Sequence, residues 1–315
     1  MKYYIGIDLG GTNIKAGIVS ENKEIIGKAS LKTNCPRPAD EIADDIAKSA
    51  LMALADSGLS IDDIESVGIG TPGTANKETG IVEFSNNLGF YNVPLRAMLE
   101  ERLNKKTFID NDANAAAYGE FLAGAAKGTK SAVCITLGTG VGSGIIVDGK
   151  ILTGAGYAGA ELGHTVIAYG GKKCTCGRNG CFEAYASATG LINMTREEML
   201  KNKSSKMWDI TGKDVNNIDG KTAFDAMRAG DESGRKVVEM YINYLGCGLV
   251  NCVNTFQPEV ICIGGGVCKE GETLLAPLRR IIEDESFCVN KEKLPKLCIA
   301  QLSNDAGIIG AAFLD

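Results

Sequence analysis

The sequence has little of several features that mark particular protein classes. It contains one histidine in 315 residues, which confines imidazole chemistry to a single position. No uncharged apolar run reaches the length of a membrane span, and the N-terminus lacks the charged and apolar regions of a signal peptide. A net charge of -6 provides no basic field for a nucleic-acid backbone. We therefore expect a cytoplasmic protein without a membrane or nucleic-acid partner.

The amino-acid composition of the chain is typical of a globular protein. Hydrophobic residues make up 44% of it and charged residues 23%, a balance that supports buried cores. A chain of this length is long enough for two domains. Strand and helix patterns alternate along it, which predicts an α/β fold.

A cluster of cysteines in a polar loop is the most distinctive local feature. Cys174, Cys176 and Cys181 lie among Gly, Lys, Arg and Asn, and the only histidine, His164, precedes the first of them by ten positions. Three thiolates and one imidazole complete a tetrahedral zinc site that is closed to water and therefore structural. A redox pair would more often be C-x-x-C, and an extracellular disulfide framework conflicts with the missing signal peptide. The alternative is that the histidine lies near the cysteines by chance.

Two strand–turn–strand segments share one pattern. "YYIGIDL" at 3–9 is followed by "GGTN" and "IKAGIVS", and "VCITL" at 133–137 is followed by "GTGVGSGIIV". Their turns align as G-T-x4-G-I, and this repeat predicts two lobes that share one architecture. Main-chain N–H groups and the Thr12 and Thr139 hydroxyls of such turns can donate to phosphate oxygens. Tight turns without a ligand have the same pattern.

Other segments complete the predicted order of elements. Helices are predicted over 40–57, 234–256 and 304–314, and strands over 66–70 and 259–266. "TFIDNDANAAAYGEFLAGAA" predicts a strand that passes into an alanine-rich helix. Residues 195–232 carry no recognisable motif, and we expect a helical cap on the second lobe there.

Two common nucleotide-binding motifs are disfavoured. "GTGVGSG" is followed by a strand rich in Ile and Val, whereas a dinucleotide fingerprint must open a helix. "GAAKGTKS" has Thr129 where the second glycine of a P-loop must stand. The Gly-Thr turns, with "GGGV" at 264–267, remain the candidates for phosphate binding.

In their order along the chain, these segments resemble the ROK family of sugar kinases. "DLGGTNIKAGIV" is similar to its phosphate motif, "DNDANAAAYGE" to its catalytic motif, "ELGHTV" with "CTCGRNGCFEAYAS" to its zinc and sugar motif, and "EVICIGGGV" to its adenosine motif. The resemblance implies a two-lobed actin-like, ribonuclease-H-like ATPase fold with a zinc knuckle in the second lobe. It further implies lobes of 1–117 plus 303–315 and of 118–302, with sugar bound between them.

The resemblance implies a catalytic role for Asp112 and a sugar site around it. Phosphoryl transfer to a hydroxyl needs a carboxylate that accepts its proton, and Asp112 occupies that position of the motif. Taken alone, Asn111 and Asp112 are also good helix caps, and the glutamates could be solvated surface charges. The implied sugar-binding residues are Gly73, Asn87, Asn111, Asp112, Glu161, His164 and Glu183.

The resemblance also implies a site for ATP and Mg²⁺. Asp8, at the end of the first strand, is placed to hold Mg²⁺ through water. The implied nucleotide-binding residues are Asp8, Gly10, Gly11, Thr12, Asn13, Lys15, Gly138, Thr139, Gly140, Gly265 and Gly266.

These features predict ATP-dependent phosphorylation of a hexose, with D-glucose as the first choice. A kinase for allose, fructose, mannose or N-acetylmannosamine is the alternative, followed by a sugar sensor without turnover. The family's repressors carry an N-terminal helix-turn-helix, and the first predicted strand begins at residue 3, which favours the enzyme. We also expect a homo-oligomer, either a dimer or a tetramer, as in many family members.

Overall fold

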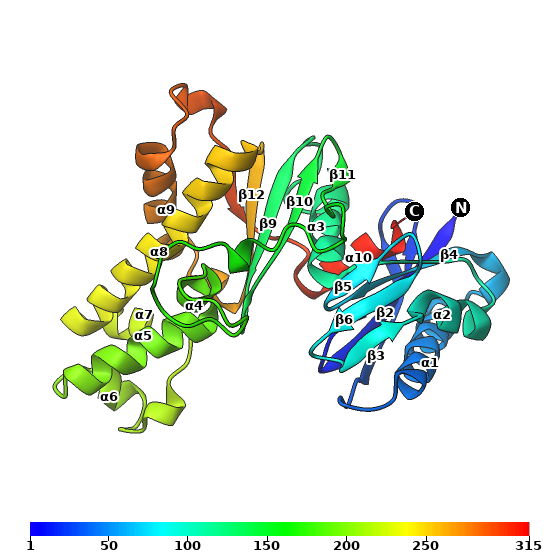
Figure 1. Cartoon of the computed structure of the whole chain (residues 1–315), viewed down its shortest axis with the longest axis horizontal. Helices are drawn as coiled ribbons and strands as arrows, with labels where there is room; N and C mark the ends of the chain where they lie inside the picture. Colours follow the sequence, from blue (N-terminus) through cyan, green and yellow to red (C-terminus); the bar gives the residue numbers. More distant parts are fainter. Residues whose placement is uncertain (315) are drawn as a thin grey trace. The chain divides into compact units, whose positions relative to one another are not determined.

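The computed structural model describes residues 1–314, which divide into two compact units (Figure 1). Unit 1 comprises Met1–Ala132, Gly144–Ala160 and Ala300–Asp315, and unit 2 comprises Val133–Ser143 and Glu161–Ile299. The lobe boundaries expected from the sequence, 1–117 plus 303–315 and 118–302, stay a prediction. Each unit is described separately below.

Unit 1 is built on a five-stranded mixed sheet in the order β3-β2-β1-β4-β8. Its strands are β1 (Tyr3–Leu9), β2 (Asn13–Ser20), β3 (Ile25–Lys32), β4 (Ile64–Thr71) and β8 (Thr107–Asn111). β1 pairs antiparallel with β2 and parallel with β4, which in turn pairs parallel with β8. The predicted hairpin of the first turn is therefore confirmed. A smaller antiparallel sheet holds β5 (Thr74–Asn76), β6 (Ile81–Ser85) and β7 (Phe90–Val93).

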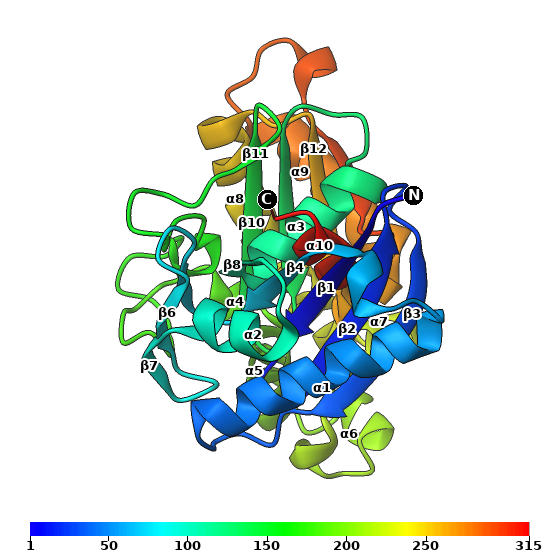
Figure 2. The same ribbon diagram turned by 90° about the vertical axis from the view of Figure 1, so that its right-hand side faces the viewer.

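Helices cover both faces of the main sheet because side chains of a strand alternate between its faces. Ile5 and Ile7 of β1 share a buried cluster with Ile42 and Ile46 of α1 (Ala39–Ser57), and Figure 2 shows α1 lying across this sheet. The helices α2 (Leu95–Leu103), α3 (Asp112–Ala123) and α10 (Ala306–Ala312) complete the unit, and α10 packs on β1, β4 and α3.

Glycine permits the close approach of α10. A Cβ atom at Gly68 of β4 would lie 1.7 Å from the Ala311 carbonyl oxygen, so any larger residue there would displace the helix. β10 (Val141–Val147) pairs antiparallel with β11 (Lys150–Ile151), and this hairpin belongs to unit 1 from Gly144 onward.

Unit 2 contains the strands β9, β12 and β13 and the start of β10, in the order β10-β9-β12-β13. These strands are β9 (Ala132–Leu137), β10 (Val141–Val147), β12 (Val260–Gly265) and β13 (Lys296–Ile299). Its helices are α4 (Glu183–Ala186), α5 (Ala188–Lys201), α6 (Met207–Ile210), α7 (Thr222–Arg228), α8 (Glu232–Phe256) and α9 (Glu272–Glu285). Residues 195–232 are largely helical, as expected.

The sequence predicted the long and strongly patterned elements. The predicted helices at 40–57 and 234–256 correspond to α1 and α8, and the predicted closing helix corresponds to α10. The small β5–β6–β7 sheet was not foreseen. Among residues 1–314, each helix is too short or too polar to cross a membrane.

Candidate functional site

The turn from β8 into α3 holds the predicted catalytic residue. Asn111 is the N-cap of α3: its Oδ1 accepts from the main-chain N–H of Ala113 at 2.8 Å and of Asn114 at 3.2 Å. Its Nδ2 donates to the Gly73 carbonyl at 3.0 Å, which brings two of the predicted sugar-binding residues together. Asp112 is the half-buried first residue of the helix. The capping role therefore belongs to Asn111, and the role of Asp112 as base stays a prediction.

A buried carboxylate supports this turn from within the protein. Asp110 is 4% exposed and accepts from the main-chain N–H of Asn111 at 2.7 Å and from Asn114 Nδ2 at 2.8 Å. Burial raises the pKa of Asp110, and the bond from Asn114 opposes that shift. Asp110 was not among the residues predicted to belong to the site. Its position at the end of an apolar strand, two residues before Asp112, could have indicated a supporting role.

The first Gly-Thr turn connects β1 with β2. Gly10 donates its N–H to the Asn13 carbonyl at 2.9 Å, and the Thr12 side chain is exposed at the tip of the turn. Behind the turn, Asp8 faces Lys15 across the hairpin, with 3.2 Å between Oδ2 and Nζ. A carboxylate oxygen at this position is a ligand type that Mg²⁺ accepts together with substrate phosphates.

A predicted sugar contact lies beside the same turn. A Cβ atom at Gly11 would lie 3.4 Å from the Asn87 Cβ atom, so the two residues are neighbours. Unit 1 thus places Asn87 beside the first Gly-Thr turn, and Gly73 beside Asn111.

The second Gly-Thr turn connects β9 with β10 in unit 2. Gly138 donates its N–H to the Gly140 carbonyl at 3.0 Å, and Thr139 is exposed at the tip. Gly265, at the end of β12, has a positive φ of 98°, and a Cβ atom there would lie 2.2 Å from the Leu137 carbonyl oxygen. Gly266 begins the short helical turn that follows. The predicted phosphate and adenosine glycines of unit 2 are therefore neighbours.

The predicted metal ligands converge. One ligand atom from each of His164, Cys174, Cys176 and Cys181 lies within 4.8 Å of the others. His164 Nδ1 lies 3.7 Å from Cys174 Sγ, and the Sγ atoms of Cys176 and Cys181 are 3.7 Å apart. Zinc bonds of about 2.0–2.3 Å in a tetrahedron separate ligand atoms by about 3.6–3.8 Å. The residues present therefore fit a zinc ion.

The thiols of this cluster differ in their surroundings. The main-chain N–H of Arg178 lowers the pKa of Cys176, whereas burial raises the pKa of Cys181 to about 12. A divalent cation would favour the thiolate form of all three cysteines.

Glu183 is held by specific partners instead of being a solvated surface charge. Its Oε2 accepts from the Val141 N–H at 3.0 Å, and its Oε1 accepts from the Thr175 hydroxyl at 3.1 Å. Glu161 begins the helical turn Leu162–His164, and desolvation of its carboxyl group raises its pKa, with His164 opposing the shift. Unit 2 thus brings Glu183 to the Cys/His cluster and to the second Gly-Thr turn.

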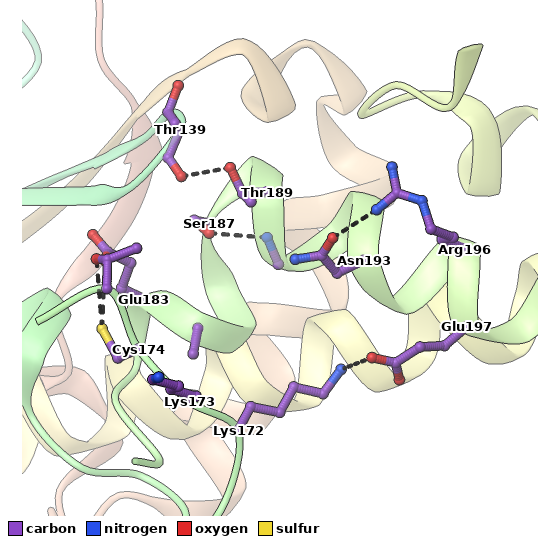
Figure 3. A pocket seen from close by; sticks show the side chains of 13 residues that line it. Thr139, Lys172, Lys173, Cys174, Glu183, Ser187, Thr189, Asn193, Arg196 and Glu197 are labelled. Carbon is purple, nitrogen blue, oxygen red and sulfur yellow. Dashed lines mark hydrogen bonds and ion pairs between the residues drawn. The ribbon is translucent and has the colours of Figure 1, made fainter. Parts of the chain in front are cut away.

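A pocket of about 290 Å³ lies along α5 in unit 2 (Figure 3). Thr139 of the second Gly-Thr turn and Cys174 of the Cys/His cluster both line it, together with Glu183. Lys172 and Arg196 extend from its wall, where Lys172 pairs with Glu197 at 2.8 Å. Most of the residues that line the pocket are polar or charged, and it adjoins both groups of predicted ligand-binding residues of this unit.

Comparisons with known proteins cover nearly the whole chain. The ROK family model matches residues 4–315. A glucokinase of Halalkalibacterium halodurans is 38% identical over 99% of this chain and 94% of its own length, and a glucokinase of Thermotoga maritima is 38% identical over 98% and 95%. A ROK family glucokinase from Streptomyces griseus, solved with glucose and AMPPNP, has a TM-score of 0.82 and 33% identity, covering 99% of this chain and 98% of that one.

Proposed function

Because the chain belongs to the ROK family, we propose that it is a sugar kinase that transfers the γ-phosphoryl group of ATP to D-glucose. The observation that carries the proposal is the likeness to glucokinases over nearly the full length of both chains. The product would be glucose 6-phosphate, with ADP released. Two lobes at 1–117 plus 303–315 and 118–302 stay part of the proposal.

Asp112 is the proposed general base. The Asn111 cap and the Asp110 hydrogen bonds support the proposal because they fix the main chain of the turn from which Asp112 extends. The base would accept the proton of the attacking hydroxyl as the bond to phosphorus forms. Asn111 and Gly73, joined by a hydrogen bond, would contact the sugar beside it.

Glucose recognition would also draw on Asn87, Glu161, His164 and Glu183. Each sugar hydroxyl both donates and accepts, and carboxylates, an amide and an imidazole meet both needs. A site that hydrogen-bonds hydroxyl groups discriminates strongly against sugars that lack them.

Nucleotide binding would use the two Gly-Thr turns and the adenosine glycines. Main-chain N–H groups and the exposed Thr12 and Thr139 hydroxyls would contact phosphate oxygens. Asp8 would hold Mg²⁺, which neutralises charge on the transferring phosphoryl group, and Gly265 and Gly266 would contact the adenosine. Gly10, Gly11, Asn13 and Lys15 of the first turn, with Gly138 and Gly140 of the second, complete the proposed nucleotide-binding set.

We also propose zinc as the occupant of the cluster formed by His164, Cys174, Cys176 and Cys181. The metal would be structural, since four protein ligands leave no open position for substrate. His164 Nδ1 faces the cluster, which leaves Nε2 for sugar recognition. The cluster would thereby fix a sugar-binding side chain.

The proposal is tested by measuring ADP release from ATP in the presence of Mg²⁺ and one sugar at a time. The sugars are glucose, mannose, allose, fructose, N-acetylglucosamine and N-acetylmannosamine. We expect glucose to dominate. A different dominant sugar would identify another sugar kinase, and a sugar that raises Tm without turnover would identify a sensor.

Asp112→Asn tests the role of the base. We expect kcat to fall by about 10²–10⁴-fold, because the amide cannot accept the proton. Asp214→Asn is the matched control: Asp214 caps an exposed helical turn, and Asn is an equally good cap. Equal turnover by Asp112→Asn and wild type would refute the assignment.

A further inference from the structure

One segment of unit 2 contacts both the metal cluster and the second phosphate turn. Residues 183–189, here called the bridging segment, begin two positions after Cys181. The phosphate turn, residues 138–141, meets this segment through three hydrogen bonds. Ala188 N–H donates to the Gly138 carbonyl at 2.9 Å, the Thr189 hydroxyl donates to the Thr139 carbonyl at 2.7 Å, and Val141 N–H donates to Glu183 Oε2 at 3.0 Å. Figure 3 shows the bond between Thr189 and Thr139.

The carboxylate of Glu183 also contacts the loop that holds the metal cluster. Its other oxygen, Oε1, accepts from the Thr175 hydroxyl at 3.1 Å and lies 3.6 Å from Cys174 Sγ. A Cβ atom at Gly140 would lie 2.3 Å from Oε2, so glycine at 140 is what lets the carboxylate reach the turn.

These bonds determine where the N–H groups of the phosphate turn point. In a planar trans peptide the N–H is directed opposite to the C=O of the same unit. Fixing the Gly138 carbonyl toward Ala188 therefore directs the Thr139 N–H away from α5. Fixing the Thr139 carbonyl toward Thr189 directs the Gly140 N–H away from α5 in the same manner. Both N–H groups belong to the turn to which the proposed function assigns the phosphate groups of the nucleotide.

We propose that Glu183 and Thr189 are positioning residues for the phosphate turn, and that through them the metal cluster and the sugar subsite are coupled to nucleotide binding. The inference rests on the proposed kinase function, which assigns phosphate to this turn and sugar to Glu183. The coupling is reciprocal, so glucose and nucleotide each change the other's affinity by the same factor through this segment.

Thr189→Val tests the contact to the turn, because valine keeps the side-chain shape and removes the hydroxyl. The Kd of AMPPNP with Mg²⁺, measured by titration calorimetry without sugar, should rise about three- to tenfold, the loss expected for one hydrogen bond. The Kd of glucose without nucleotide should stay within about twofold of wild type, because Thr189 is outside the proposed sugar contacts. Thr195→Val is the matched control, since the Thr195 hydroxyl donates to the Leu191 carbonyl of its own helix at 2.8 Å.

Thr175→Val tests whether the metal-cluster loop acts on the phosphate turn through Glu183. Thr175 touches Glu183 and lies on the metal-cluster loop, outside the phosphate turn. A purely local role predicts no change in AMPPNP affinity, whereas the bridging segment predicts a rise in Kd of about two- to fivefold. The factor by which glucose strengthens AMPPNP binding should shrink in both variants and persist in Thr195→Val.

Wild-type affinity for AMPPNP in both Thr189→Val and Thr175→Val would overturn the inference and leave the kinase function standing. Wild-type protein that binds no AMPPNP would overturn the proposed function together with the inference. Weaker AMPPNP binding in Thr195→Val equal to that in Thr189→Val would also overturn it, because the effect would then come from α5 in general.

Discussion

Substitution of Glu120 tests how much one buried carboxylate contributes to the stability of unit 1. This residue of α3 is 3% exposed, and its carboxylate accepts hydrogen bonds from three main-chain N–H groups. Oε2 accepts from Ala125 at 2.8 Å and Gln301 at 3.1 Å, and Oε1 accepts from Leu302 at 2.7 Å. Glu120 therefore joins the end of α3 to the segment that enters α10.

Glu120→Gln keeps the shape of the side chain and removes one acceptor. With its carbonyl toward Ala125 and Gln301, the glutamine must direct its NH₂ group at the Leu302 N–H, which is itself a donor. A buried donor without a partner costs about 1–3 kcal/mol, and the two remaining bonds lose their charge assistance. We expect a total loss of about 3 kcal/mol in the free energy of unfolding, or a fall in Tm of about 6–12 °C.

Urea unfolding followed by far-UV circular dichroism measures this loss. Trp208, the only tryptophan, lies in unit 2, so its fluorescence reports the other unit separately. Glu239→Gln is the matched control, because Glu239 is 55% exposed and its i,i+4 pair with Arg235 is worth about 0.5 kcal/mol. A Glu120→Gln protein within about 0.5 kcal/mol of wild type would show that the three bonds contribute nothing net.

Two further outcomes are expected. Treatment with a strong chelator, followed by restored Mg²⁺, should lower Tm by about 5 °C or more and weaken glucose binding, because it would remove the proposed zinc ion that Cys174, Cys176 and Cys181 share. Metal analysis that finds no zinc in fresh protein would contradict this prediction. Burial raises the folded-state pKa of Asp110, so wild type loses stability as pH rises from the unfolded value of about 3.9 through the folded value. Asp110→Asn should therefore gain stability relative to wild type over that range in urea titrations, and a difference that is constant from pH 4 to 7 would refute the reasoning.

Sequence patterning was sufficient for elements whose periodicity is strong and local. Alternation in "YYIGIDL" predicted β1 over the residues that form it, and the long apolar helical pattern predicted α8 to within two residues. The β5–β6–β7 sheet escaped prediction because its strands are three to five residues long and carry too few repeats of a pattern.

The sequence also predicted one part of the candidate site and left another part open. Cysteine spacing and a single histidine predicted a metal cluster, and the structure brings those four side chains together. The sequence left open whether Asn111 or Asp112 caps α3, because both residues cap equally well, and the folded turn assigned the cap to Asn111.

What the sequence by itself determined is the identity and order of the chemical groups: two Gly-Thr turns, the Asn111–Asp112 pair, and a Cys3His set. Only the tertiary structure decided their partners, because these contacts join residues distant along the chain. Val141 meets Glu183 across 42 positions, and Glu120 meets Leu302 across 182. Hydrogen bonds of this kind leave no periodic trace in a sequence, since their geometry exists only after separate strands and helices have packed.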